Sequence, residues 1–341
     1  MKPRICLLLA AVLSLPALVQ ARVLTLSNNP QNPGQYSTYT AAEAAATAGD
    51  TIYVHGSPVS YNSITITKAI TLIGPGHNPQ KQAPLKATFE NVALQSSNIS
   101  VIGIICNYFY PSTSSLSNVL LSRNRIEYYI YVQFHNCNNW RIEGNVISYL
   151  GNDYAFRSYN YNLWDFFFDN NIFNGYLSDN FYGTSYNMYF NNCVFLKKSG
   201  SADYHARTWK NATYTNCIFY GKNPAIANET SGNVFNNCIS YAAADNSFPG
   251  SGSGNIVNQN PLFASYSGNG FVYTDNYALQ AGSPGKSYGL DGNDLGLYGG
   301  TYVWNQNGLP KLPYISEFTI SNNQVSAGGT LNINFKSSIA Q

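Results

Sequence analysis

Aspartates recur at matching places in a repeated stretch of the sequence. Asp153 lies eight residues after Asn145, and Asp179 lies eight residues after Asn171, while Asp203 follows at an offset of ten in the next copy of the repeat. If the copies stack, neighbouring carboxylates come within about 5 Å, where two ionised groups repel by roughly 3 kcal/mol at an effective dielectric near 20. A shared proton, a nearby arginine or a calcium ion relieves such repulsion. The spacing therefore predicts a metal site for Ca²⁺ made by Asp153, Asp179 and Asp203.

The segment from Ser201 to Lys210 gathers ionisable and aromatic side chains around the third aspartate. Elimination from a uronate sugar needs a cation that neutralises its carboxylate and a base that removes the adjacent proton. A glycoside hydrolase would instead use two of the carboxylates as acid and base. The candidate catalytic residues are Arg207, His205 and Lys210, and the candidate substrate-binding residues are Arg157, Tyr204 and Trp209.

A structural interpretation of these residues stays open. Asp153 and Asp179 both lie in short polar stretches with Asn and Gly or Ser, where an aspartate can make a turn through its own side chain. Arg207 could pair with Asp203 on the surface, where an ion pair contributes little to stability.

The elements that must position these side chains follow from the repeat itself. Each copy consists of a short apolar strand, a polar bend and a second apolar strand. Equivalent positions follow one another at intervals of 26, 22, 24, 21 and 23 residues, at Asn145, Asn171, Cys193, Cys217, Cys238 and Pro261. Periods of this size are typical of solenoids, and short runs of Val, Ile, Phe and Tyr alternating with polar residues favour strands over helices.

Two adjacent positions of the repeat determine how the chain bends and stacks, and we call the residues at each position a column. The first is always Gly or Asn, which tolerate positive φ, so we expect a left-handed bend there and a ladder of amide hydrogen bonds along the stack. Its members are Gly103, Gly144, Asn170, Asn192, Asn216, Asn237 and Asn260. We expect the second column to pack inward. Its members are Ile104, Asn145, Asn171, Cys193, Cys217 and Cys238.

The first residues of the chain are typical of a secretory signal peptide. Lys2 and Arg4 precede an apolar run that ends at Val19, and Val19-Gln20-Ala21 supplies short side chains at a cleavage site. The run is too short for a membrane span of roughly 20 residues. Residues 1–21 are therefore predicted to be removed on export to the periplasm, the cell surface or the medium. No membrane span is expected afterwards.

Five cysteines remain after Cys6 leaves with this segment, and an odd number cannot all pair within the chain. Exported proteins usually oxidise exposed thiols, so we expect these five to be buried packing residues. Their disulfide state stays open. They are Cys106, Cys137, Cys193, Cys217 and Cys238.

The composition restricts the partners. Charged residues make up 10% of the chain, against roughly 25% in ordinary soluble domains, and the net charge is +2 with no basic stripe. Nucleic-acid binding is therefore not expected. The 28 tyrosines suit an extracellular polysaccharide, because tyrosine offers both a stacking face and a hydroxyl. Tyrosine and asparagine equally suit the faces and turns of a β-solenoid.

Several segments resemble secreted right-handed parallel β-helix proteins of the pectate-lyase-like superfamily. Residues 50–54 and 64–76 look like the opening coils, the alanines of residues 41–46 look like the capping helix, and residues 277–285 with 294–300 are similar to the closing segment. The resemblance spans Val23 to Tyr302 and implies an all-β fold. The signatures of polygalacturonases, pectate lyases and pectin methylesterases are missing from the sequence, so no family catalytic residue is carried over.

The predicted organisation is a signal peptide (1–21), a parallel β-helix with a short N-terminal capping helix (22–304), a linker (305–313) and a β-rich tail (314–341). We expect the tail to form two strands that lie against the helix, or to serve in anchoring or export. The style of the signal and tail favours a bacterial protein. The leading functional hypothesis is polysaccharide binding or a rigid surface or matrix rod; the alternative is a polysaccharide lyase or glycoside hydrolase acting on uronate-type glycans. The oligomeric state stays open.

Overall fold

The computed structural model describes residues 21–78, 85–134, 136–148, 154–158, 163–179, 185–196, 204–226, 232–302, 304–322 and 324–339. Asp153 and Asp203 lie outside these ranges, and for Asp179 the structure describes the backbone but not the side chain.

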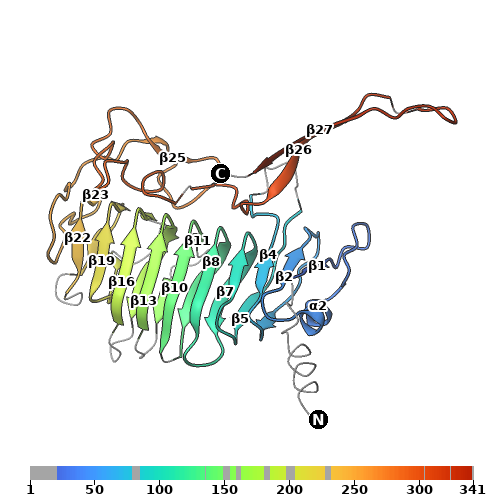
Figure 1. Ribbon diagram of the computed structural model, residues 1–341. Coiled ribbons are helices and arrows are strands. Elements are labelled where there is room, and N and C mark those ends of the chain that lie inside the picture. Colours follow the sequence, from blue (N-terminus) through green and yellow to red (C-terminus); the bar gives the residue numbers. More distant parts are fainter. Residues whose placement is uncertain are drawn as a thin grey trace, which may run out of the picture.

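Two long sheets run the length of the coils, and their strands pair in parallel. One sheet has ten strands: β1 (Val23–Leu26), β2 (Thr51–Val54), β4 (Thr71–Ile73), β6 (Ser100–Ile102), β8 (Ser117–Ser122), β10 (Cys137–Glu143), β13 (Leu163–Asp169), β16 (Ser185–Asn191), β19 (Ala212–Thr215) and β22 (Val234–Asn236). The other has thirteen: β3 (Ile64–Ile66), β5 (Asn91–Leu94), β7 (Ile105–Pro111), β9 (Arg125–Val132), β11 (Val146–Ser148), β12 (Tyr154–Ser158), β14 (Ile172–Asn174), β15 (Tyr176–Asp179), β17 (Val194–Leu196), β18 (Tyr204–Ala206), β20 (Ile218–Tyr220), β21 (Asn223–Ala225) and β23 (Ile239–Tyr241). The chain is a right-handed parallel β-helix, as the repeat predicted (Figure 1).

Stacked aromatic rings fill the space between the sheets. The ring of Phe168 lies 4.3 Å from that of Phe190, which lies 4.8 Å from that of Tyr214, and Phe235 continues the stack at 4.8 Å. All four side chains are fully buried. Burial of such a side chain contributes about 1.5–3 kcal/mol, so each coil adds its own increment to the core. The register that stacks these rings also stacks the residues on the outer faces.

The predicted bend column is confirmed over most of its length. Gly103, Gly144, Asn170, Asn192, Asn216 and Asn237 all have φ between 49° and 69°. Asn260 does not belong to the column, because the left-handed residues near it are Asn258 and Leu262. Arg123 takes the bend position in its coil with φ at 57°, although arginine carries no sequence signal for this conformation.

The predicted amide ladder exists, but in the second column. Asn145 Oδ1 accepts hydrogen bonds from the backbone and side-chain nitrogens of Asn124, at 2.9 and 3.1 Å, and Asn171 Oδ1 does the same for Asn145. Each of these asparagines is fully buried. The side chains of the second column therefore do point inward, as predicted, and they satisfy backbone groups that the bend leaves unpaired.

Cysteine continues this ladder where asparagine stops. The side-chain amide of Asn171 donates to the carbonyl of Ile142, and the thiol of Cys193 donates to the equivalent carbonyl of Phe168, at 3.2 Å. Cys217 and Cys238 repeat the contact in the next two coils. All five described cysteines are free and buried, which confirms the prediction of packing residues.

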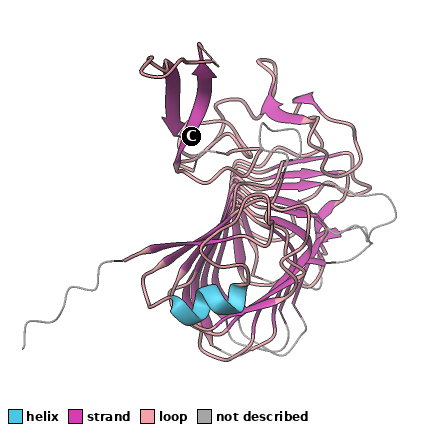
Figure 2. Cartoon of the chain, turned by 90° about the vertical axis from the view of Figure 1, so that its right-hand side faces the viewer, coloured by secondary structure: helices cyan, strands magenta, loops and turns pink. Residues whose placement is uncertain are grey.

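A short helix, α2 (Tyr39–Ala45), closes the N-terminal end of the core (Figure 2). Ala42 and Ala46 are buried against the first coils, as expected of the alanine-rich segment. The hydroxyl of Thr38 accepts from the Ala41 backbone at the first turn, and Lys68 Nζ donates to three carbonyls at the last turn. Both ends of the helix are thus capped.

The amides of the bend column bind a C-terminal strap, defined here as residues 285–312. Asn170 Nδ2 donates to the carbonyls of Leu297 and Gly299, at 2.8 and 2.9 Å. Asn192 donates to Asp294 and Gly296 in the strap. The first column was predicted to form the ladder, and this is wrong because the strap lies along the bends and takes their amides (Figure 1).

Arg123 and Gly144 explain the exceptions to asparagine in this column. Arg123 Nε donates to the Tyr302 hydroxyl at 2.9 Å, and its Nη1 donates to the Leu309 carbonyl. A Cβ at Gly144 would meet the Tyr302 ring at 2.5 Å, so only glycine leaves room for this part of the strap. A two-stranded sheet of β24 (Phe263–Ser265) and β25 (Asn276–Leu279) precedes the strap.

The tail forms an antiparallel hairpin of β26 (Pro313–Ile320) and β27 (Ile333–Ile339). Figure 1 shows it extending away from the coils, so the expectation that it lies against the helix is wrong. Phe318 and Phe335 are correspondingly 56% and 66% exposed. Within the described part of the chain, no helix has the length and apolar character needed to cross a membrane.

Candidate functional site

The predicted metal site falls mostly outside the described residues. Asp153 and Asp203 are not described, and only the backbone of Asp179 is, in β15 beside Ser158 of β12. Among the described residues, no three His, Cys, Asp or Glu side chains are grouped so that they could hold a metal ion. The calcium site of these three aspartates stays a prediction.

Two of the predicted site residues are in the core. His205 is fully buried between the rings of Phe195 and Phe219, each 5.8 Å away. Burial holds the pKa of His205 well below its usual value, with a further contribution from Lys222, so the ring is neutral near pH 7. Trp209 is also fully buried, edge-on to Phe156 at 5.1 Å. Neither side chain can contact a polysaccharide outside the coils.

The remaining candidates lie on or near the outer surface. Arg207 is exposed, and Arg157, Tyr204 and Lys210 are partly exposed. Arg157 lies in β12 and Tyr204 in β18, while Arg207 directly follows β18 and donates its backbone N–H to the Leu177 carbonyl at 3.1 Å. The structure therefore separates Arg157 and Arg207 on the outside from His205 and Trp209 on the inside.

Alternation along the strands explains this separation. Phe109, Ile130, Phe156, Leu177 and Ala206 are register partners from β7 to β18, and all are buried. The residues directly after four of them point to the opposite face, namely Tyr110, Tyr131, Arg157 and Arg207. The preceding residues in β12, β15 and β18 are buried, namely Ala155, Tyr176 and His205. In β18 both His205 and its buried neighbour Ala206 are inside the coils.

Two columns of tyrosine and arginine side chains cover the outer face of these strands, and we call them the Tyr–Arg face. The first column is Tyr108, Tyr129 and Tyr154, and it ends at Tyr176, whose ring is buried. The second column is Tyr110, Tyr131, Arg157 and Arg207. In the first column the ring centres are 4.8, 5.9 and 4.7 Å apart. A bulge in β12 between Tyr154 and Phe156 shifts the register at the middle of this column.

The guanidinium groups are seated against these rings. Arg157 lies 4.6 Å from the ring centre of Tyr154 and 5.4 Å from that of Tyr131. Arg207 lies 5.7 Å from the ring centre of Tyr176. Cation–π contacts of this kind contribute about 0.5–1 kcal/mol at exposed sites and hold the guanidinium plane in a fixed orientation. The face thus presents flat rings and oriented cations along successive coils.

Sequence reasoning missed most of this face. None of its six tyrosines was among the candidates, although Tyr108-Phe109-Tyr110 and Tyr129-Ile130-Tyr131 show the period of two that puts both tyrosines of each pair outside. The signal was present, but it could not be placed beside Arg157 without the register of β9 and β12.

Comparisons with known proteins give weak structural likenesses. No protein-family model matches the chain, and no curated protein sequence is similar to it. Among solved structures, pectate lyase Pel9A shares 14% identity over 85% of this chain and 98% of its own, with a TM-score of 0.46. The pectin methylesterase of Aspergillus niger shares 16% identity over 68% and 86%, with a TM-score of 0.36. The alginate lyase AlyGC shares 13% identity over 74% and 42%, with a TM-score of 0.32. Likenesses of this strength assign neither a family nor an activity, so the function must be argued from the site.

Proposed function

We propose that this protein is exported and binds an extracellular polysaccharide that contains uronate sugars along the Tyr–Arg face. The observation that carries the proposal is the pair of parallel columns, in which tyrosine rings repeat from coil to coil and two guanidinium groups lie against them. A polymer with a repeated unit suits a surface with a repeated unit.

Each residue type has a physical role in such binding. A tyrosine ring packs against the C–H face of a sugar, and its hydroxyl donates to or accepts from sugar hydroxyls. Arginine binds a carboxylate through two parallel N–H donors, and such charge-assisted bonds are roughly twice as strong as neutral ones. Arg157 and Arg207 therefore favour a polymer that carries carboxylates over a neutral one.

A rigid core supports this role. The inner neighbours of the face are buried aliphatic and aromatic side chains, including Phe109, Ile130 and Phe156. Rings fixed on such strands lose little conformational freedom on binding, so more of the contact energy appears as affinity. The same rigidity would serve a surface or matrix rod.

A second candidate function is polysaccharide lyase activity at the same face, and the exposure of Arg207 favours it. The backbone pairing of Leu177 with Ala206 puts Arg207 beside Ser178, the residue before Asp179. If Asp153, Asp179 and Asp203 hold calcium there, the ion would neutralise a uronate carboxylate next to Arg207. His205 takes no part, because it is inside the coils.

Binding and turnover are separated by one set of measurements. The full chain is incubated with polygalacturonate, with alginate and with neutral glucan, each with calcium and with a chelator. Affinity is measured by calorimetry, and turnover by ultraviolet absorbance of unsaturated ends and by reducing sugar. Binding to the two polyuronates without turnover supports the proposal; turnover that is lost in Asp179→Ala and Arg207→Ala supports the lyase. No affinity for either polyuronate contradicts both.

A further inference from the structure

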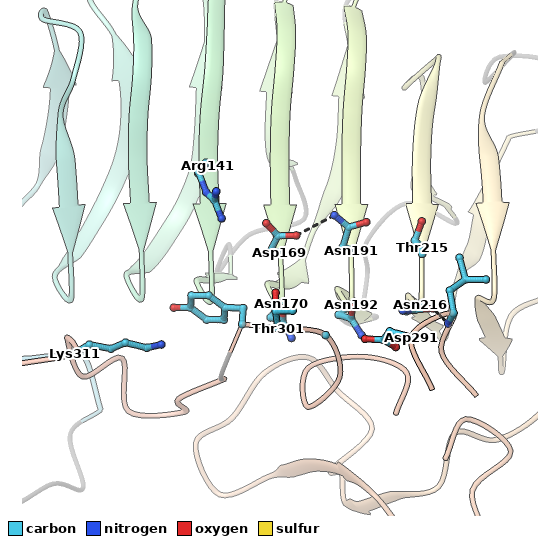
Figure 3. A pocket seen from close by; sticks show the side chains of 13 residues that line it. Arg141, Asp169, Asn170, Asn191, Asn192, Thr215, Asn216, Asp291, Thr301 and Lys311 are labelled. Carbon is cyan, nitrogen blue, oxygen red and sulfur yellow. Dashed lines mark hydrogen bonds between the residues drawn. The ribbon is translucent and has the colours of Figure 1, made fainter. Parts of the chain in front are cut away.

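A cavity of about 440 Å³ lies on the other sheet, where the ends of β10, β13, β16 and β19 meet the strap (Figure 3). It is lined by Arg141, Asp169, Asn191, Asp291, Tyr302 and Lys311, together with further Asn, Thr and Gly residues. Cavities of this volume take small ligands. The strap residues come from more than a hundred positions further along the chain than Asp169, so the sequence gives no local sign of the site.

The floor of the cavity is the last outward row of the ten-stranded sheet. Glu143, Asp169, Asn191 and Thr215 are register partners in this row. Asn191 Nδ2 donates to Asp169 Oδ1 at 2.9 Å, and Figure 3 shows both side chains directed into the same space. Burial, followed by the charge of Glu143, raises the pKa of the Asp169 carboxyl from its usual value. The row therefore offers a carboxyl and an amide held side by side.

Two cations lie at the side of this floor. Arg141 Nε is paired with Glu143 Oε1 at 2.5 Å while its side chain stays 62% exposed. Lys311, from the strap, lies with Nζ 5.9 Å from the ring centre of Tyr302. Figure 3 shows Arg141 pointing toward Asp169 from the adjacent strand. Arg141, Lys311, Asp169 and Asp291 line the cavity, and Glu143 adds a third carboxylate that is paired with Arg141.

An aromatic pair adjoins the floor. Phe167 and Tyr189 lie two residues before Asp169 and Asn191 on the same strands and therefore on the same face. Their rings stack at 5.4 Å with an interplanar angle of 14°. At about 3.3 Å per residue, this pair is about 6.6 Å from the polar row. A sugar ring that packs against the exposed edges of the pair can thus reach the polar row with its substituents.

We infer that this cavity, called the groove below, binds a neutral sugar of one or two hexose units. It would be a second glycan site, separate from the Tyr–Arg face. Sugar hydroxyls both donate and accept, which suits walls that alternate carboxyl, amide, guanidinium and ammonium groups. The exposed edges of the stacked pair contact the apolar C–H groups of the sugar. Three carboxylates against two cations disfavour a uronate, so a neutral sugar suits these walls better.

The strap completes the site. Tyr302, Asp291 and Lys311 belong to it, and Asn170 and Asn192 of the bend column hold it beside the floor. The bend asparagines line the cavity themselves and also hold the strap beside Asp169 and Asn191 through their side-chain amides.

The test uses saturation-transfer NMR and calorimetry on the full chain, with cellobiose, maltose and lactose as probes. Phe167→Ala and Asp169→Asn remove the platform and the charge of the floor, and Arg157→Gln on the other face is the control. We expect at least one disaccharide to bind the natural chain. Its affinity should fall about tenfold or more in both groove variants and stay within twofold in the control.

Two results would overturn the inference: no transfer to any of the three disaccharides at millimolar concentration, or equal affinity in the natural chain and both groove variants. Circular dichroism and thermal unfolding show whether each variant is folded. If one of the two groove variants does not fold, Tyr189→Ala, which also changes a side chain on the outer face, takes its place. Polygalacturonate binding is measured in parallel. If polygalacturonate binding is lost in Arg157→Gln and kept in the other variants, the Tyr–Arg face is intact as a proposal whatever the disaccharides show. The two proposals can therefore fail independently.

Discussion

The guanidinium of Arg157 lies over the ring of Tyr154, 4.6 Å from its centre. This contact joins the two columns of the Tyr–Arg face, because Tyr154 belongs to the first and Arg157 to the second. It orients a cation at the surface before any ligand arrives, and such preorganisation lowers the entropic cost of binding.

Replacement of Arg157 should weaken binding in a way that depends on geometry as well as on charge. Arg157→Gln removes the cation, and we expect the affinity for polygalacturonate to fall by about tenfold to a hundredfold, since one charge-assisted hydrogen-bonded pair contributes about 1.5–3 kcal/mol. Arg157→Lys keeps the charge but loses the planar fork and should recover only part of the affinity. Calorimetry at two salt concentrations measures both effects. Tyr53→Ala, a partly exposed tyrosine of the other sheet, is the matched control, and equal losses in it and in Arg157→Gln would contradict the assignment.

The inward ladder should contribute unequally to stability along its length. Asn145→Ala removes the acceptor of two hydrogen bonds from Asn124 and the donor of one to the Leu121 carbonyl, and all of these groups are buried. We therefore expect the free energy of unfolding to fall by about 3 kcal/mol. Cys217→Ala removes a weaker thiol hydrogen bond to the Phe190 carbonyl and should cost about 1 kcal/mol. Denaturant unfolding compares the two variants. A larger loss in the cysteine variant would show that the thiols are not mere substitutes for asparagine.

The bend asparagines combine a backbone role with a side-chain role, and two variants at Asn170 separate them. Asn170→Gly keeps φ near 51° at little cost but loses the amide bonds to Leu297 and Gly299. Asn170→Ala loses the same bonds and adds about 1–2 kcal/mol for a left-handed alanine. We expect both variants to expose the strap to limited proteolysis to the same degree. Only the alanine variant should lower the unfolding temperature of the coils further, and identical unfolding of the two would contradict this division.

Asp50 should make stability depend on pH. The hydrogen bond from the Arg22 guanidinium, together with backbone donors from Arg22 and Thr47, holds the pKa of the Asp50 carboxyl well below its usual range. Its folded pKa is thus below the unfolded value of about 3.9, so its contribution is fully present above that value and is lost as the pH falls through the folded pKa. The difference in unfolding temperature between the natural chain and Asp50→Asn should therefore be constant near neutral pH and shrink in acid. A difference that stays constant into acid would contradict the linkage.

Cleavage after Ala21 would add to this effect. It would turn the Arg22 backbone nitrogen, now 2.8 Å from Asp50 Oδ1, into an ammonium group. We expect Asp50→Asn to destabilise a chain that begins at Arg22 more than a chain that keeps residues 1–21. Thermal unfolding of the four proteins tests this, and equal effects in both backgrounds would count against a role of Asp50 at the new N-terminus.

The coil and its bends could be predicted because one position in each coil must adopt positive φ, and Gly and Asn mark it. Asn170, Asn192, Asn216 and Asn237 confirm this. The destination of their amides could not be predicted, because the strap that accepts them lies about a hundred residues further along the chain.

The candidate site was predicted only in part, and register is the reason. Counting from Asn145 and Cys193 placed the candidates in or beside β12 and β18 but could not decide which of these side chains face outward. Arg157 and Arg207 are outside, whereas His205 and Trp209, a few residues away in sequence, are in the core. A shift of one residue moves a side chain to the opposite face of a strand.

The central claim is that a polyuronate lies along the Tyr–Arg face, and hydroxyl-radical footprinting tests it most directly. Tyrosine oxidation is measured by mass spectrometry with and without saturating oligogalacturonate. We predict protection of Tyr110, Tyr131 and Tyr154, with unchanged oxidation of Tyr53 and Tyr298 elsewhere on the molecule. Saturable binding without protection of these three rings, or with protection confined to other faces, would contradict the claim.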